Sequence, residues 1–79
     1  MNGIRVDPDR LLLERSRRGL SQAALARNAG LACLTVSRIE RGKAGVVHAV
    51  TAYKLAIALR LDVEDLTRTL RPLQAASEG

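Results

Sequence analysis

The sequence predicts an all-α fold, a compact bundle of five short helices. Hydrophobic residues make up 47% of the 79 positions, but Tyr53 is the sole aromatic residue, so Leu, Ala and Val must supply the core. Leu and Ala are strong helix formers. The two prolines are Pro8 and Pro72, which leaves residues 9–71 without the strongest helix breaker.

The first helix is predicted over residues 8–18. Asp7 is a good N-cap, and Pro8 suits the first helical position. Gly19 follows two arginines and is expected to end the helix, since cations and a following glycine are typical of a C-terminus. The spacing predicts that one face of this helix carries Leu11, Leu12 and Arg15.

The second and third helices are predicted over residues 22–29 and 32–41. Ser21 caps the second helix, and Gly30 ends it in a left-handed conformation. The N-cap of the third helix falls on Ala32, whose side chain cannot accept a hydrogen bond. This omission costs about 1 kcal/mol of helix stability.

The chain after Gly42 is predicted as a loop over residues 43–50 followed by two more helices. Thr51 is expected to cap a helix over residues 52–60. The acidic stretch at residues 62–65 is typical of a helix start and predicts a fifth helix that ends near Pro72. The organisation expected is an N-terminal arm over residues 1–6, one domain over residues 7–71 and a flexible C-terminal tail over residues 72–79.

Residues 22–41 predict a helix-turn-helix, which is two helices joined by a short turn that contains glycine. Gly30 occupies the turn, and Ala26 is small where the two helices must cross closely. Apolar residues at suitable spacing are expected to converge between the helices. They are Leu25, Ala29, Leu31, Val36 and Ile39.

The stretches "LLLERSRRGLSQAALARNAGL", "TVSRIERGK" and "KLAIALRLDVEDL" resemble the Cro and lambda-repressor-like (XRE-type) helix-turn-helix family. The resemblance covers about residues 7–70. It implies a five-helix DNA-binding domain whose members bind operator DNA, usually as dimers. The chain departs from the family pattern at Ala32, where Ser or Thr is usual, at Arg60, where Gly is common, and in the apolar segment 43–50.

The resemblance implies that the third helix enters the major groove of double-stranded DNA. Arg38 is the principal candidate for reading bases, because an arginine can bind guanine O6 and N7 together. Cys33 and Leu34 could pack against thymine methyl groups. A phosphate contact by Arg38, an inert Cys33 and oxidation control through Cys33 remain alternatives. The expected base-contacting residues are Cys33, Leu34, Ser37 and Arg38.

The resemblance also implies contacts to the DNA backbone. Gln22 lies at the start of the second helix, where backbone N–H groups also attract anions. Thr35 could bind a phosphate or cap its own helix. For Arg41 and Lys43, the alternative is that they form a solvated turn. The expected phosphate-contacting residues are Gln22, Thr35, Arg41 and Lys43. Arg15 and Glu40 are expected to form a structural ion pair between the first and third helices.

A homodimer is expected, because one short helix gives little specificity and paired recognition helices lie about 34 Å apart on DNA. The expected interface is the fifth helix with the turn before it, although these residues could instead close the monomer core. The expected interface residues are Leu61, Val63, Leu66 and Leu70.

The function expected is a transcription regulator, a repressor on a palindromic operator. A net charge of +5, with 13 basic residues against 8 acidic ones, favours an anionic partner. The alternative is an antitoxin-type module of the same fold whose partner is a toxin or another regulator. No enzymatic activity, metal or cofactor is expected, since no nucleophile with a base, metal-ligand cluster or phosphate loop appears. One cysteine and the lack of a long apolar run favour a cytoplasmic protein without membrane contact.

Overall fold

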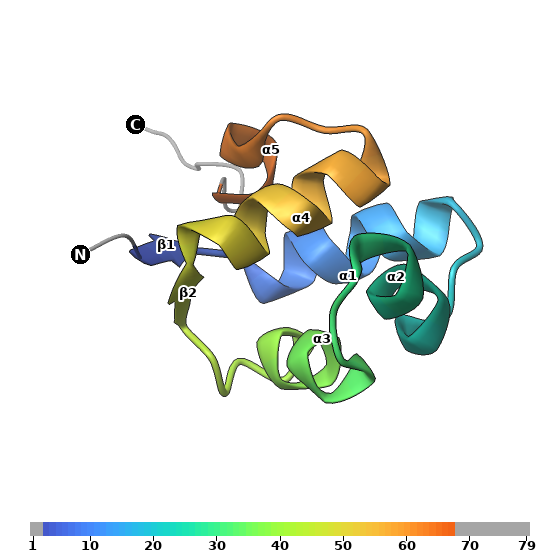
Figure 1. Ribbon diagram of the computed structural model, residues 1–79, viewed down its shortest axis with the longest axis horizontal. Coiled ribbons are helices and arrows are strands. Elements are labelled where there is room, and N and C mark those ends of the chain that lie inside the picture. The colour runs from blue at the N-terminus through green and yellow to red at the C-terminus, as the bar shows by residue number, and fades with distance from the viewer. Residues whose placement is uncertain (1–2, 68–79) are drawn as a thin grey trace, which may run out of the picture.

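The computed structural model describes residues 3–67, which form five helices and a small two-stranded sheet (Figure 1). The helices are α1 (Pro8–Arg17), α2 (Gln22–Ala29), α3 (Cys33–Glu40), α4 (Ala49–Leu59) and α5 (Val63–Thr67). The strands are β1 (Gly3–Arg5) and β2 (Val46–His48). The all-α prediction with five helices is therefore confirmed, with a short β-ribbon as an addition. The predicted end of the fifth helix, the tail over residues 72–79 and Leu70 lie outside the described residues.

Helix α1 begins as its sequence predicts. The Asp7 carboxylate accepts a hydrogen bond from the Arg10 amide at 2.9 Å, and Pro8 is the first helical residue. Its buried face differs from the prediction, because Leu11 and Glu14 are buried whereas Leu12 is 43% exposed. The reason is that Glu14 lies three positions after Leu11 and shares its face, while Leu12 is rotated from Leu11 by roughly 100°.

Helices α2 and α3 have the predicted bounds to within one residue. The Ser21 hydroxyl accepts from the Ala24 amide at 3.0 Å, and Gly30 ends α2 with a φ of 70°. This left-handed φ is readily accessible only to glycine. Ala32 is the N-cap of α3 and offers no side-chain hydrogen bond, as predicted.

The segment predicted as a loop contains β2, which pairs antiparallel with β1. Residues Gly3, Ile4 and Arg5 face His48, Val47 and Val46 respectively, so part of the predicted N-terminal arm is joined to the domain. The chain passes from β2 directly into α4, which begins at Ala49. Thr51 therefore lies inside α4, and the prediction that it caps the helix is wrong.

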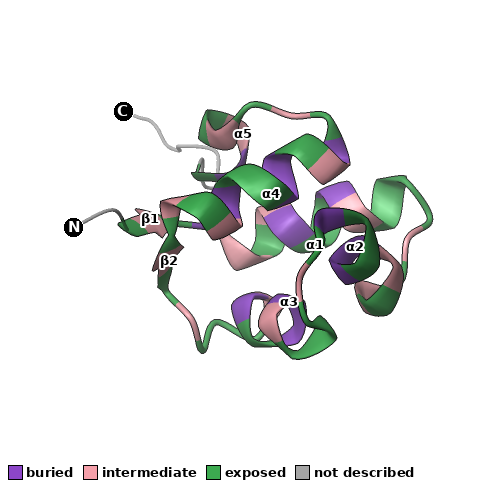
Figure 2. Cartoon of the chain, in the orientation of Figure 1, coloured by how far each residue is buried: buried purple, intermediate pink, exposed green. Residues whose placement is uncertain are grey.

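The core lies between all five helices and the segment that precedes α1. Helix α2 packs against α3 and α4, and α1 packs against α3 and α5. The buried apolar residues come from every helix, and Figure 2 colours the buried segments of the chain purple. A hydrogen bond of 2.8 Å from the Asp7 amide to the Leu66 carbonyl joins the start of α1 to α5. This packing leaves one side of α3 uncovered.

Candidate nucleic-acid interface

The turn between α2 and α3 holds the two helices at a fixed angle. Leu25, Val36 and Ile39 have no exposed area, and Ala26 is 1% exposed. The Leu31 amide donates to the Ala26 carbonyl at 2.8 Å, which closes the turn after Gly30. The predicted convergence of apolar residues is confirmed, and it determines which side of α3 faces solvent.

The exposed side of α3 carries Leu34 and Arg38, which are four residues apart and therefore neighbours on the helix surface. Leu34 is 60% exposed, a large value for an apolar side chain. Cys33, at the start of the helix, is also exposed. An exposed surface of this kind, with one arginine beside a leucine and a cysteine, is suited to the edges of base pairs in the major groove.

Ser37 does not belong to this exposed surface. It is only 9% exposed, although the sequence analysis assigned it to the base-contacting residues. Ser37 follows the core residue Val36 by one position, so it lies at the edge of the buried face, roughly 100° from the Val36 direction. Its short side chain is covered there. We therefore assign Ser37 to the packing of α3.

Thr35 is half-buried in the first turn of α3, and its backbone amide donates to the Ala32 carbonyl at 3.0 Å. Beyond the other end of the helix, Arg41 and Lys43 are exposed. The Lys43 amide donates to the Arg38 carbonyl at 2.9 Å, with Gly42 between them at a φ of 75°. Two exposed cations therefore follow directly after α3.

Arg15 and Glu40 form a two-point ion pair that joins α1 to α3. The Arg15 Nε–Glu40 Oε2 distance is 2.7 Å and the Arg15 Nη2–Glu40 Oε1 distance is 2.9 Å. Arg15 Nη1 also donates to the Leu20 carbonyl at 2.8 Å. Burial alone would raise the pKa of the Glu40 carboxyl, but hydrogen bonds from Arg15 and Gln22 lower it below its ordinary value.

Gln22 belongs to the same network. Its Nε2 donates to Glu40 Oε1 at 2.9 Å, which orients the amide group at the first turn of α2. This hydrogen bond uses one of the two hydrogens on the amide nitrogen. The contact between Gln22 and Glu40 was not predicted, because it depends on how α2 and α3 pack.

Of the three described residues that were predicted for a dimer interface, Leu66 is buried in the core, while Leu61 and Val63 are half-buried. Leu66 has no exposed area, so the prediction that it contacts a partner is wrong. Leu61 and Val63 are half-buried and pack against the same core. These residues are covered because the apolar face of α5 packs against α4.

Glu14, which was not predicted as a site residue, is a buried carboxylate that is only 3% exposed. Arg10 Nε lies 2.7 Å from its Oε2, and Arg18 Nη1 lies 2.8 Å from its Oε1. Arg17 is more distant, at 3.8 Å. Hydrogen bonding from Arg18, joined by Arg10, lowers the pKa of Glu14 against the opposing effect of burial. The spacing of arginines three and four residues from Glu14 was the available signal.

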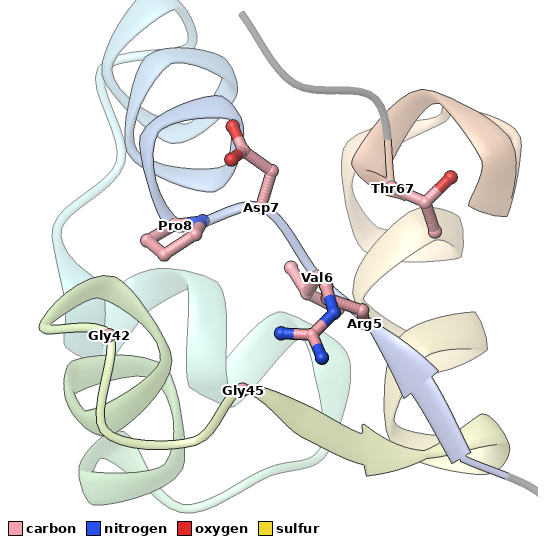
Figure 3. Close-up of a pocket in the computed structure, with 7 residues that line it drawn as sticks. All are labelled: Arg5, Val6, Asp7, Pro8, Gly42, Gly45 and Thr67. Carbon is pink, nitrogen blue, oxygen red and sulfur yellow. The ribbon is translucent and has the colours of Figure 1, made fainter.

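A pocket of about 290 Å³ opens beside the end of α3, between the start of α1 and the loop that leads to β2 (Figure 3). Arg5 extends into it towards the loop, and a Cβ atom on Gly45 would lie 3.4 Å from its Nη1. Asp7 also lines the pocket, but its carboxylate already caps α1. None of the residues predicted to contact DNA lines this pocket.

Two negative findings concern residues 3–67 alone. Within them, no group of three or more His, Cys, Asp or Glu side chains is placed to hold a metal ion. In the same part of the chain, no helix has the length and apolar character needed to cross a bilayer.

Comparisons with known proteins agree with this geometry. The family model described as "Helix-turn-helix domain" matches residues 9–70. The restriction-modification controller protein C.AhdI from Aeromonas hydrophila is 39% identical, with 75% of this chain and 88% of that chain covered and a TM-score of 0.71. The comparison with curated proteins gives no match.

Two structures of SinR are also similar. The master regulator for biofilm formation SinR, solved in complex with DNA, is 29% identical over 75% of this chain and 94% of that one, with a TM-score of 0.72. The N-terminal DNA-binding domain of SinR from Bacillus subtilis is 27% identical over 80% of this chain and 91% of that one, with a TM-score of 0.75.

Proposed function

The chain belongs to the XRE-like helix-turn-helix family of DNA-binding transcription regulators, and from that premise we propose that it is a repressor that binds a palindromic operator as a dimer. The observation that carries the proposal is the exposed side of α3. Its core side is fully buried, whereas Leu34 and Arg38 face solvent beside the exposed cations Arg41 and Lys43. A helix held in this way can enter the major groove while its flanks contact phosphates.

In the proposed complex, Arg38 reads a guanine, and Leu34 and Cys33 contact thymine methyl groups. Gln22, Thr35, Arg41 and Lys43 contact phosphates. Arg15 and Glu40 do not touch DNA in this proposal. They hold α1, α2 and α3 together and orient Gln22 through its 2.9 Å hydrogen bond to Glu40. The protein acts by binding and not by catalysis, and we place it in the cytoplasm.

A selection of bound sites from random duplexes tests this proposal. We expect one palindromic sequence to be enriched, and we expect its affinity to fall steeply as the salt concentration rises. Binding that is absent at low salt, or that enriches no sequence, would refute the proposal.

Charge-removing variants sharpen the test. Arg41→Gln and Lys43→Gln should each weaken binding about equally for all sequences and reduce the slope of log K against log salt by about 1. Arg60→Gln removes the same charge from the turn between α4 and α5, which lies on the other side of the molecule from α3 (Figure 1). This control should leave the slope unchanged.

A protein-interaction module of antitoxin type is the second candidate function. The observation that favours it is the 60% exposure of Leu34, because an exposed leucine on a surface helix also suits a protein partner. The Leu34→Ala variant separates the two candidates. A loss confined to sites that contain thymine favours DNA reading, whereas unchanged DNA binding favours the protein partner.

A further inference from the structure

The pocket beside the end of α3 contains a cation that none of the proposed DNA contacts uses. Arg5 of β1 extends into this pocket, and Gly42 and Gly45 of the loop after α3 also line it (Figure 3). We propose that Arg5 binds a phosphate of the DNA backbone beside the major groove that α3 enters. The inference rests on the proposed function and adds a contact from a segment that precedes residues 9–70, the part matched by the helix-turn-helix model.

The β-ribbon determines the direction of the Arg5 side chain. Val6 is 1% exposed, and Ile4 is half-buried and packs against the core. Successive side chains of an extended segment point to opposite sides, so Arg5, between these two residues, faces away from the core. Across the ribbon, Arg5 is paired with Val46. The guanidinium is therefore carried by a fixed backbone, which limits the conformational entropy lost on binding.

The same ribbon places Arg5 next to the segment that follows α3. Its partner Val46 is the first residue of β2, and residues 41–45 alone separate β2 from α3. A Cβ atom on Gly45 would lie 3.4 Å from Arg5 Nη1, so the guanidinium lies close to the backbone of this loop. Arg5 is therefore at the same end of α3 as the exposed cations Arg41 and Lys43, although it is distant from them in the sequence.

The charge of Arg5 is not compensated by an ion pair with any residue in the range 3–67. The four arginines of residues 8–18, in contrast, all pair with Glu14 or Glu40. Asp7 lines the same pocket, but its carboxylate accepts from a backbone amide and caps α1. The segment 41–50 contains no acidic residue. An uncompensated guanidinium in a region of positive charge is suited to an anion from outside the chain.

The two neighbouring cations favour DNA as the source of the phosphate. A DNA strand presents a row of phosphates, so Arg5, Arg41 and Lys43 can each hold one at the same time, and their contributions add. A free anion would be held by a single exposed arginine, and an exposed ion pair of that kind contributes little. The pocket of about 290 Å³ leaves room for a phosphate group beside the guanidinium, which can donate to two of its oxygens.

The salt dependence of binding to the selected operator tests this contact. Arg5→Gln should reduce the slope of log K against log salt by about 1, as the loss of one phosphate contact does. Arg5→Lys keeps the charge and should restore the slope but not the full affinity, because an ammonium group lacks the two-point geometry. Arg60→Gln is again the control. A wild-type slope in Arg5→Gln, in a protein of unchanged helical content, overturns the inference.

Uncharged methylphosphonates, placed one at a time in the operator backbone, identify the phosphate that Arg5 binds. At one position beside the site read by α3, the replacement should weaken wild-type binding about tenfold. The same replacement should not weaken the binding of Arg5→Gln any further, because the contact is already lost. If every position weakens the two proteins by the same factor, Arg5 has no phosphate partner and the inference is refuted.

A matched pair of substitutions in the loop tests the site without altering Arg5. Gly45 has no positive φ, so a side chain there causes no backbone strain. Gly45→Asp places a carboxylate beside Arg5 Nη1, whereas Gly45→Asn has the same shape without the charge. We expect the Asp variant to bind the operator at least about tenfold more weakly than the Asn variant, and this difference to shrink when Arg5→Gln is also present. An equal difference with and without Arg5 contradicts the inference.

The outcomes separate this inference from the proposed function. If the wild type selects an operator and Arg41→Gln reduces its salt slope while Arg5→Gln does not, the function stands and the Arg5 contact is refuted. If the wild type binds no duplex at low salt, both fail. Inorganic phosphate without DNA tests the other source of the anion. Saturable shifts of the Arg5 side-chain NMR signals below about 1 mM phosphate would assign the pocket to a free phosphate compound and overturn the inference.

Discussion

Arg38 has its place on the proposed DNA-facing surface because of where Val36 and Ile39 lie. Those two side chains have no exposed area and face the core, so the side chain of Arg38 faces solvent on another side of α3. Its neighbour Leu34 is exposed on the same side. The buried residues of α3 thus determine which of its residues face solvent and are free to contact DNA in the proposed complex.

We expect Arg38→Gln to reduce discrimination at one base pair by about 1–3 kcal/mol, because a two-point contact to guanine would be lost. Equilibrium binding to the selected site and to its single-base variants measures this change. Arg41→Gln is the matched control, which should weaken binding to every sequence alike. Uniform weakening by Arg38→Gln would instead assign Arg38 to a phosphate.

Arg60 shows how a single residue can carry backbone strain. It ends α4 with a φ of 58° and a ψ of 44°, and it is the one described residue other than glycine with a positive φ. A side chain in this left-handed region costs about 1–2 kcal/mol. Its amide nonetheless makes the helix-ending contact, to the Ile57 carbonyl at 3.1 Å.

We expect Arg60→Gly to raise the free energy of unfolding by up to about 1 kcal/mol, because glycine relieves the strain but has more freedom in the unfolded chain. Urea denaturation measures the change. Gly30→Ala is the opposite substitution at a φ of 70° and should destabilise the domain by a similar amount. A loss of stability in Arg60→Gly would show that the arginine side chain contributes more than its strain costs.

At the scale of elements, Glu40 is the residue that joins three helices. It accepts from Arg15 on α1 and from Gln22 on α2 while belonging to α3. Its side chain is only 6% exposed, and that of Arg15 is 14% exposed. A buried ion pair adds little to the free energy of unfolding compared with a pair of apolar residues of similar size. Removing one partner, however, leaves the other charge buried without compensation.

We expect Glu40→Gln to lower the free energy of unfolding by about 3 kcal/mol, because Arg15 would keep its charge without its carboxylate. Thermal or urea unfolding measures the loss. Glu64→Gln on the exposed part of α5 is the control and should change stability by less than about 0.5 kcal/mol. Equal effects of the two substitutions would contradict the joining role of Glu40.

At the scale of the whole molecule, two buried carboxylates make stability depend on pH. The pKa of Glu14 is lowered chiefly by its hydrogen bond from Arg18, and the pKa of Glu40 is lowered by Arg15 and Gln22 against desolvation. A carboxyl whose pKa is lower in the folded state binds fewer protons than it does in the unfolded state. Its contribution is complete above the ordinary value of 4.5 and is lost as the pH falls through the lowered pKa.

We therefore expect the free energy of unfolding to be nearly constant between about pH 7 and pH 5.5 and to decline progressively below about pH 4.5. Urea denaturation at a series of pH values measures the profile. Glu14→Gln should lower stability at neutral pH and flatten the acidic decline, because one of the two carboxyl groups with a lowered pKa no longer titrates. A decline of unchanged steepness in that variant would exclude Glu14 as a cause.

The sequence by itself determined the five helices, the turn at Gly30 and the inward residues Leu25, Val36 and Ile39. These features depend on local rules, namely capping, glycine conformation and the spacing of apolar residues along one helix. The exposure of Arg38 followed from the same spacing. The partnership of Arg15 and Glu40 came from the resemblance to a known family, since no local rule joins residues on different helices.

Tertiary structure alone decided the features that depend on contacts between distant segments. Strand β1 forms because β2 lies beside it, and three residues are too few to show a strand pattern. The burial of Ser37 and Leu66 depends on what packs over them. The exposure of Tyr53 and Ile57 could not be predicted from the local sequence either. An apolar residue is expected in the core unless the fold shows that its side of the helix is uncovered.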